Sequence, residues 1–268
     1  MNRKAWSRSR FWLCHFLHSR HVRQPIEWGS RTDTDPQFVD AMTPWLNASR
    51  YDPHEGGAWL VARAVRDNPY DPAYIQSLRL LVKEQCYQDE LIDRTLDRCG
   101  SAAAPQRRIV SSAGTRLGRL RRRWLGSRFE MSLLLFGNLL DLMFLTMIGT
   151  RCVDAAVTGA LKNITTDKRA HILFCMERLT WSYADFQFVR RNLRRLRLRW
   201  MWAVMLVHAA RRHGPLIRAC GSSRIQFVFA GTRRFAGLLE SMVPYRREAL
   251  LSALLAQRRH PFAKPNLP

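Results

Sequence analysis

The sequence predicts an all-α protein, and three observations support this fold class. Long segments repeat apolar residues at three- and four-residue spacing, which is the period of one helix face. Residues that typically start or stop helices stand at the ends of these segments. The segments lack the strict alternation of apolar and polar residues that a half-buried strand shows.

The chain of 268 residues is long enough to bury a substantial core, and we expect one helical domain over residues 37–260. Residues 1–36 are basic with little periodicity, and we expect them to form a disordered arm. They lack an apolar segment followed by a small-residue cleavage site, so no signal peptide is expected. Residues 261–268 are expected to be a loose tail.

The first helices are expected at residues 37–46, where Pro44 limits regularity, and at residues 58–65 before the DNPYDP turn. Asp71 is well placed as an N-cap, with Pro72 at the first helical position. The helix that follows is predicted over residues 72–98, with Gly100 as its stop.

A basic linker is expected at residues 101–126, and a long apolar helix at residues 127–149. Asp154 is expected to cap a helix over 155–186, which is followed by helices at 189–213, 225–242 and 245–259. The linker would then be a long crossover between two helix pairs. The predicted architecture is a four-helix bundle with additional C-terminal helices.

The charge balance is the unusual feature of the composition. Lys and Arg number 44 against 21 Asp and Glu, which gives a formal net charge of +23. Such a surface favours an anionic partner, but a general bias of composition toward Arg is the preferred explanation and needs no ligand. The densest run places Arg at positions 190, 191, 194, 195, 197 and 199. This run is either a solvated helix face or part of a phosphate-binding patch.

The six cysteines form no CxxC pair, and several lie in apolar helical segments, so we expect a reduced, cytoplasmic protein. Residues 131–149 are long and apolar enough to suggest a membrane span. Asp141 at the centre of this segment favours a helix buried in a bundle instead. We therefore expect no integral membrane span.

Two motifs resemble those of a known superfamily. The segment KEQCYQDELIDRTLDRCG is similar to the second helix of ferritin-like proteins, which carries Glu-x-x-His. The segment ITTDKRAHILFCMERL is similar to their fourth helix, which carries Asp-Glu-x-x-His, as in bacterioferritins, rubrerythrins and ribonucleotide reductase small subunits. The resemblance covers about residues 71–179 and implies a four-helix bundle around a di-iron or di-manganese centre.

Three residues are the candidate metal ligands that this resemblance implies. Glu84 and His171 stand at ligand positions of the two motifs. Glu55 lies about as far before the DNPYDP turn as Glu84 lies after it, so it is the candidate carboxylate of the preceding helix. Without metal, Glu84 would be a surface carboxylate or would cap a polar pocket, and His171 would be a hydrogen-bonded core residue.

Two positions depart from the family pattern. Tyr87 stands where the second helix has its His, and Lys168 stands where the fourth helix has its Glu. A charged ammonium has no lone pair for a metal. We expect Tyr87 to hydrogen-bond His171 or Glu84, and Lys168 to be a counter-ion of Glu84. Other neighbours of the site are Asp167, which matches the family, and Asp141, which needs a cationic partner such as Lys168 or an Arg.

The leading hypothesis is therefore a ferritin-like protein, related to di-iron oxidoreductases, whose metal site is incomplete or lost. Iron or manganese would be the cofactor of a retained site, but the substitutions favour no bound metal. The alternative is a basic helical module that binds nucleic acid or another anionic partner. Enzymatic activity and the catalytic residues stay open, and a homodimer is compatible with both hypotheses.

Overall fold

The computed structural model describes residues 3–19, 23–29, 34–50, 57–100, 116–183 and 188–242. For residues 3–7, 116–125, 188, 189 and 191 it describes the backbone alone. Within these ranges all regular secondary structure is helical and no strand occurs, which confirms the all-α prediction for this part of the protein. The described helices are α1 (Arg3–Ser19), α2 (Pro36–Ser49), α3 (Ala58–Asp67), α4 (Pro72–Arg98), α5 (Arg116–Gly149), α6 (Ala155–Tyr183), α7 (Phe188–Arg212), α8 (Gly214–Ala219) and α9 (Arg224–Met242).

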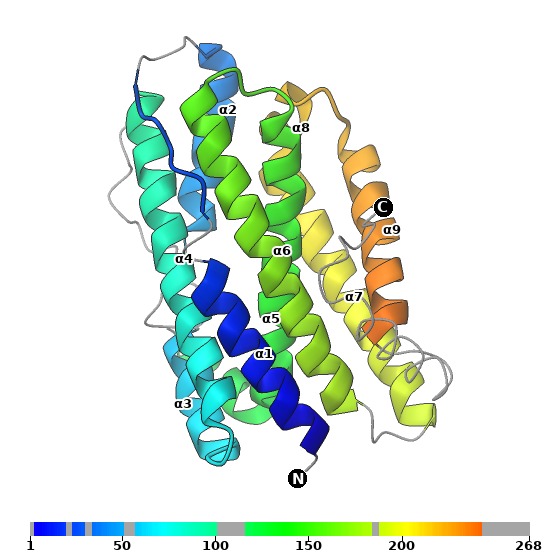
Figure 1. Ribbon diagram of the computed structural model, residues 1–268. Helices are drawn as coiled ribbons and strands as arrows, with labels where there is room; N and C mark the ends of the chain where they lie inside the picture. Colours follow the sequence, from blue (N-terminus) through cyan, green and yellow to red (C-terminus); the bar gives the residue numbers. More distant parts are fainter. Residues whose placement is uncertain are drawn as a thin grey trace.

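The long helices α4, α5 and α6 lie side by side and form the centre of the bundle (Figure 1). The most extensive helix contact is between α5 and α6, which are joined by a short loop and run antiparallel. Helices α7 and α9 cover one side of this centre, and α1 crosses over α4 and α6. The shorter α3 contacts α4 and α5, and α2 contacts α8 and α4.

The start of two central helices follows from capping residues that the sequence reveals. The Asp71 side chain accepts a hydrogen bond from the Tyr74 amide at 3.0 Å, and Pro72 opens α4 as predicted. The Asp154 side chain accepts from the amides of Ala156 and Val157, at 2.9 and 3.0 Å, at the start of α6. Both caps satisfy amides that have no partner within the helix.

The structure has a break where the long apolar helix was expected to begin, but the expectation of a linker at residues 101–126 is wrong in part. Helix α5 consists of two helical segments on either side of Gly126, so residues 116–125 of that linker are helical. Gly126, with φ of 74° and ψ of −178°, interrupts the helical backbone between the two parts. This conformation is open to glycine and strained for other residues. Residues 101–115 of the expected linker, the expected helix at 245–259 and the tail lie outside the described residues.

The expected disordered arm is also wrong for residues 3–19, which form α1. Phe16 is fully buried and packs edge-on against Phe174 of α6, with ring centroids 5.6 Å apart. The Ser9 hydroxyl donates to Asp71 at 2.6 Å and accepts from Arg178 at 2.7 Å. Apolar and small residues at three- and four-residue spacing therefore face the bundle, although the segment as a whole is basic.

One described helical stretch, Gly126–Gly149, is long and apolar enough to cross a membrane by length and composition. In its most apolar window 61% of the residues are buried inside the bundle. Leu135, Phe136 and Ile148, for example, are fully buried against neighbouring helices. The stretch is thus consistent with the expectation of a core helix rather than an integral span.

Candidate functional site

Two of the predicted ligand residues meet between α4 and α6. The Nε2 atom of His171 lies 2.8 Å from Oε2 of Glu84, and the two residues are 0% and 1% exposed. Both occupy the face of their helix that carries core residues, since Leu81 and Leu91 share that face of α4. The arrangement therefore places an acidic and an imidazole group in the protein interior.

The second oxygen of Glu84 is held by the N-terminal segment. The Ser19 hydroxyl donates to Oε1 at 2.9 Å, and Nη2 of Arg23 lies 3.6 Å from the same atom. The same Arg23 nitrogen donates to Oδ2 of Asp167 at 2.8 Å, where the side chain of Gln88 also donates at 3.4 Å. We call this set the Glu84 network, with members Ser19, Arg23, Glu84, Gln88, Asp167 and His171.

The environment shifts the pKa values of the two carboxyl groups in opposite directions. Burial acts to raise the pKa of Glu84, but the hydrogen bonds from His171 and Ser19 and the charge of Arg23 outweigh it and lower the pKa. Burial and the nearby charge of Glu84 raise the pKa of Asp167, and Arg23 only partly offsets them. Glu84 is therefore the stable anion of the network.

The protonation of His171 follows from its hydrogen bonds. Its buried Nδ1 atom has no hydrogen-bond partner among the described residues. A proton on Nδ1 would leave a buried donor unsatisfied, which costs about 1–3 kcal/mol. A proton on Nε2 instead donates to the Glu84 carboxylate at 2.8 Å. The geometry thus fits a proton on Nε2 that Glu84 accepts.

The two substituted positions of the family pattern point to other partners. Tyr87 was expected to bond His171 or Glu84, but its ring lies under the guanidinium of Arg23, 4.2 Å from the ring centroid. The Lys168 ammonium was expected to accompany Glu84, but it lies 2.8 Å from Oδ2 of Asp141. The expectation that Asp141 needs a cation such as Lys168 is confirmed.

The residues that converge here do not fit a di-metal centre. The described residues contain no group of three or more His, Cys, Asp or Glu side chains that could hold a metal ion. The Arg23 guanidinium lies beside the carboxylates of Glu84 and Asp167, and the Lys168 ammonium lies beside that of Asp141, so cations already neutralise the acidic groups of this region. Glu55, the candidate ligand of the preceding helix, lies outside the described residues. The interior instead holds a set of hydrogen-bonded ion pairs that crosslinks α4, α6 and the N-terminal segment.

The motifs did not reveal the contribution of Ser19 and Arg23. Both residues lie in the segment 1–36, which was expected to be disordered because it is basic and shows little apolar periodicity. The available signal was the spacing of Trp12, Phe16 and Ser19, which places all three on one side of a helix. Trp12 and Phe16 are 5% and 0% exposed.

A pocket beside the network opens at the Lys168–Asp141 pair. It has an empty volume of about 280 Å³, including space open to solvent, and Trp45 and Leu145 form apolar parts of its wall. Gln88, a member of the Glu84 network, also lines it. The pocket therefore lies next to the Glu84 network.

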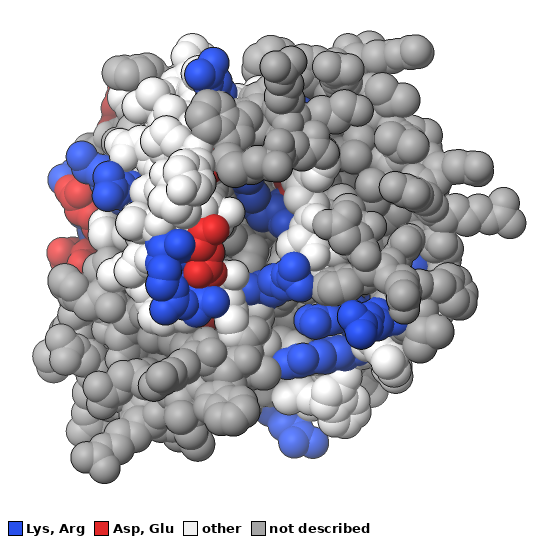
Figure 2. All heavy atoms as spheres, turned by 90° about the horizontal axis from the view of Figure 1, so that it is seen from below, with Lys and Arg blue, Asp and Glu red and all other residues white. Residues whose placement is uncertain are grey.

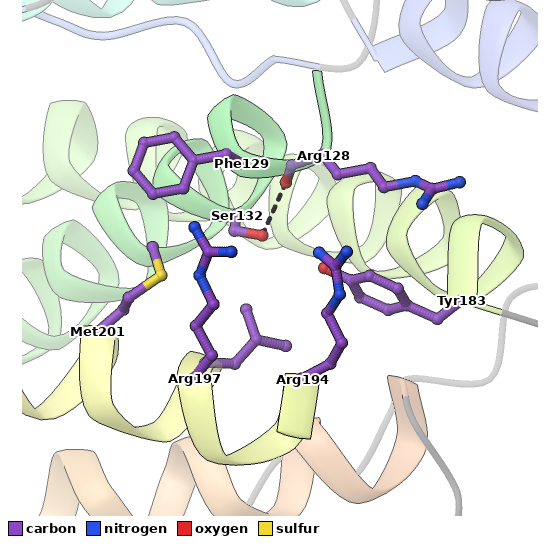
Figure 3. Close-up of a pocket in the computed structure, with 8 residues that line it drawn as sticks. Arg128, Phe129, Ser132, Tyr183, Arg194, Arg197 and Met201 are labelled. Carbon is purple, nitrogen blue, oxygen red and sulfur yellow. Dashed lines mark hydrogen bonds between the residues drawn. The ribbon is translucent and has the colours of Figure 1, made fainter. Parts of the chain in front are cut away.

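A second pocket is lined by arginines and was not predicted as a unit. It lies between the part of α5 after Gly126, the end of α6 and the start of α7, with an empty volume of about 300 Å³ that includes open space. Figure 3 shows the side chains of Arg194 and Arg197 extending from α7 toward Ser132 of α5, with Tyr183 of α6 beside them. We call this the arginine pocket; its lining residues are Arg128, Phe129, Ser132, Tyr183, Arg194, Arg197, Leu198 and Met201.

The electrostatics of the arginine pocket favour a negatively charged group. Among the described residues that line it, three are Arg and none is Asp or Glu. The guanidinium of Arg197 also lies 5.9 Å from the centroid of the Phe129 ring, which helps to orient it. Figure 2 views the lower end of the bundle, where Lys and Arg side chains form a row on the side where α7 begins, with few Asp and Glu among them.

Comparison with known proteins provides no family assignment. No protein-family model matches this chain, and neither the curated proteins nor the solved structures include a significant match.

Proposed function

We propose that this protein binds an anionic partner through the arginine pocket. The observation that carries the proposal is the convergence of three arginines, Arg128, Arg194 and Arg197, on one pocket. Guanidinium groups form paired, charge-assisted hydrogen bonds with phosphate and carboxylate oxygens. The net charge of +23 adds a long-range attraction that increases the rate of encounter with such a partner.

The test measures binding of tripolyphosphate by calorimetry across a series of salt concentrations. The double variant Arg194→Gln/Arg197→Gln should lose about tenfold or more in affinity, because each charge-assisted bond contributes about 1.5–3 kcal/mol. The control Arg66→Gln/Arg79→Gln removes the same charge at exposed positions of α3 and α4 and should keep most of the affinity. Equal losses of affinity in both variants would show that binding depends only on the overall charge, and this result would exclude the arginine pocket as the anion-binding site.

A ferritin-like relationship is the second candidate, and the contact between Glu84 and His171 favours it. We propose that the chain shares this bundle architecture and that the Glu84 network stands where its relatives hold metal. The two residues match the family motifs, and their side chains meet at 2.8 Å between α4 and α6. The substitutions at Tyr87 and Lys168 favour the loss of oxidoreductase activity.

Metal analysis separates a retained site from a lost one. The protein is produced with iron and manganese supplied, and its metal content is measured for the parent, Glu84→Ala and His171→Ala. We expect substoichiometric metal in all three proteins, because Arg23 already neutralises the Glu84 carboxylate and Lys168 replaces a ligand carboxylate of the family motif. Stoichiometric metal that is present in the parent and absent from both variants would overturn the lost-site proposal and restore di-metal chemistry.

A further inference from the structure

Helix α7 carries two apolar stripes on opposite faces. The inner stripe includes Leu198, Trp202 and Leu206, which are 3%, 1% and 0% exposed and pack in the bundle. The outer stripe is displaced from it by two residues along the sequence, which is a rotation of about 200° around a helix. We call this second set the outer stripe; its members are Leu193, Leu196, Trp200, Val204 and Val207.

The outer stripe is exposed along most of its length. Leu193, Leu196 and Trp200 are 62%, 66% and 70% exposed, and Val204 is 50% exposed. The spacing of three and four residues aligns these side chains over about four helical turns, or roughly 20 Å. Isolated apolar residues are common on surfaces, but a contiguous apolar stripe marks an interaction site.

The flanks of the outer stripe are basic. Arg197 and Arg190 lie about 60–80° to one side of Trp200 around the helix, and Arg199 lies about 100° to the other side. The 25 residues of α7 include no Asp or Glu. The stripe with its flanks therefore has the pattern of a helix that lies in the boundary between water and lipid.

We infer that the outer stripe of α7 docks on the surface of an anionic lipid bilayer. The aliphatic side chains and Trp200 would enter the region between headgroups and acyl chains, where Trp is favoured, while the flanking arginines contact lipid phosphates. This inference rests on the proposed anion binding and names its partner, since Arg197 belongs to both the arginine pocket and the flank.

Charge and chemistry favour this occupant over two others. A second copy of the chain would bring the flanking arginines of both copies together, which costs energy through like-charge repulsion. A nucleic acid would contact the arginines and stack on Trp200, but it offers little to Leu193, Leu196 and Val204. A bilayer surface complements both the charge and the aliphatic groups.

The experiment measures co-sedimentation of the full chain with vesicles of phosphatidylcholine, with and without phosphatidylserine. The parent should sediment with the vesicles that contain phosphatidylserine and stay in the supernatant when the vesicles contain phosphatidylcholine alone. The stripe variant Leu193→Ser/Trp200→Ser/Val204→Ser should lose about tenfold or more in partitioning, because it removes most of the insertable apolar area. The control Tyr70→Ser/Val153→Ser removes two other exposed apolar side chains, 73% and 71% exposed, and should bind like the parent.

Variants of the flank and soluble anions distinguish the remaining outcomes. Arg190→Gln/Arg199→Gln leaves the arginine pocket intact and should weaken vesicle binding while tripolyphosphate binding persists. Undiminished vesicle binding by the stripe variant would overturn the inference and leave a purely electrostatic contact. If tripolyphosphate binds but vesicles do not, the inference fails and the proposed function stands; if neither binds, both fail.

Two further readouts test the alternative occupants. Duplex DNA binding that depends on Trp200 more strongly than vesicle binding does would assign the stripe to nucleic acid. A clear fall in the thermal midpoint of the stripe variant would indicate that another segment of the chain, or a second copy, covers the stripe in solution. Either result would overturn the inference. Sedimentation velocity of the parent and the variant would then show whether a second copy or another segment of the chain causes the lower midpoint.

Discussion

The imidazole of His171 and the carboxylate of Glu84 form a buried contact of 2.8 Å that joins α6 to α4. Ser19 and Arg23 bind the other oxygen of the same carboxylate, so the N-terminal segment closes the site from a third side. A buried ionic group is stable only when its remaining hydrogen-bonding positions are filled. The network meets this condition for Glu84 by drawing on three separate segments of the chain.

Removing one member of this contact should destabilise the fold strongly. We expect His171→Ala to lower the free energy of unfolding by roughly 3–5 kcal/mol, because it leaves a buried carboxylate without one of its partners. The double variant Glu84→Met/His171→Leu should recover part of this loss, since apolar groups need no partner. Urea unfolding followed by circular dichroism measures both changes.

The control for that experiment is an exposed ion pair on the same helix. Arg94 and Glu90 lie 2.8 Å apart on α4 but are 54% and 56% exposed. Glu90→Gln should cost less than about 1 kcal/mol, because solvent already screens the pair. Comparable losses for His171→Ala and Glu90→Gln would contradict the structural importance of the Glu84 network.

Local signals explain why much of the helical scaffold could be predicted. Asp71 and Asp154 cap their helices through contacts with amides two or three residues ahead, so the sequence alone reveals them. The predicted helix over residues 72–98 coincides with α4. The need of Asp141 for a cation could also be predicted, because a carboxylate in an apolar helix needs a partner, but the sequence left Lys168 and an Arg as alternatives.

The remainder depends on contacts that are distant in the sequence. Arg23 reaches Glu84 and Asp167 across 61 and 144 positions, and no local pattern identifies such partners. The basic composition of residues 1–36 obscured the apolar face of α1. The role of this face in packing is evident only in the structure, where α4 and α6 lie against it. Similarly, the arginine pocket forms only when α5, α6 and α7 meet.

The packing of α1 leads to a second prediction. Phe16 is fully buried and contacts both Phe174 and His171, at centroid distances of 5.6 and 6.0 Å. Phe16→Ala should therefore cost about 3–5 kcal/mol, the usual loss when a buried Phe is truncated. Leu17→Ala changes the neighbouring residue, which is 47% exposed, and should cost much less. Urea midpoints compare the two, and equal midpoints would indicate that α1 is detached in solution.

The third prediction concerns pH and His213, the N-cap residue of α8. Burial, aided by the charges of Arg212 and His208, lowers the pKa of His213 to about 4. The unfolded chain has the ordinary value of about 6.5, so between these values it binds a proton that the folded chain does not. Stability is thus full above about pH 6.5 and falls as the pH decreases toward 4.

Replacement of His213 tests this sign directly. His213 packs edge-on against Phe144, with centroids 5.4 Å apart, so His213→Gln should cost some stability at pH 7. The difference in free energy of unfolding between variant and parent should become smaller as the pH falls to 4.5, because only the parent loses stability by protonation of His213 in the unfolded chain. Urea unfolding at pH 7, 5.5 and 4.5 provides the measurement, and a constant difference would show that His213 titrates alike in both states.

The fourth prediction uses two glycines of α5 that differ only in backbone conformation. A Cβ atom added to Gly126 or to Gly137 would meet no atom within 4 Å, so neither substitution creates a clash. Gly126 has a φ of 74°, and Gly126→Ala should cost about 1–3 kcal/mol in backbone strain. Gly137 lies inside the regular helix, so Gly137→Ala should instead stabilise the protein by about 0.5–1 kcal/mol. Thermal unfolding of both variants measures these opposite shifts, and stabilisation by Gly126→Ala would mean that α5 continues unbroken through this position in solution.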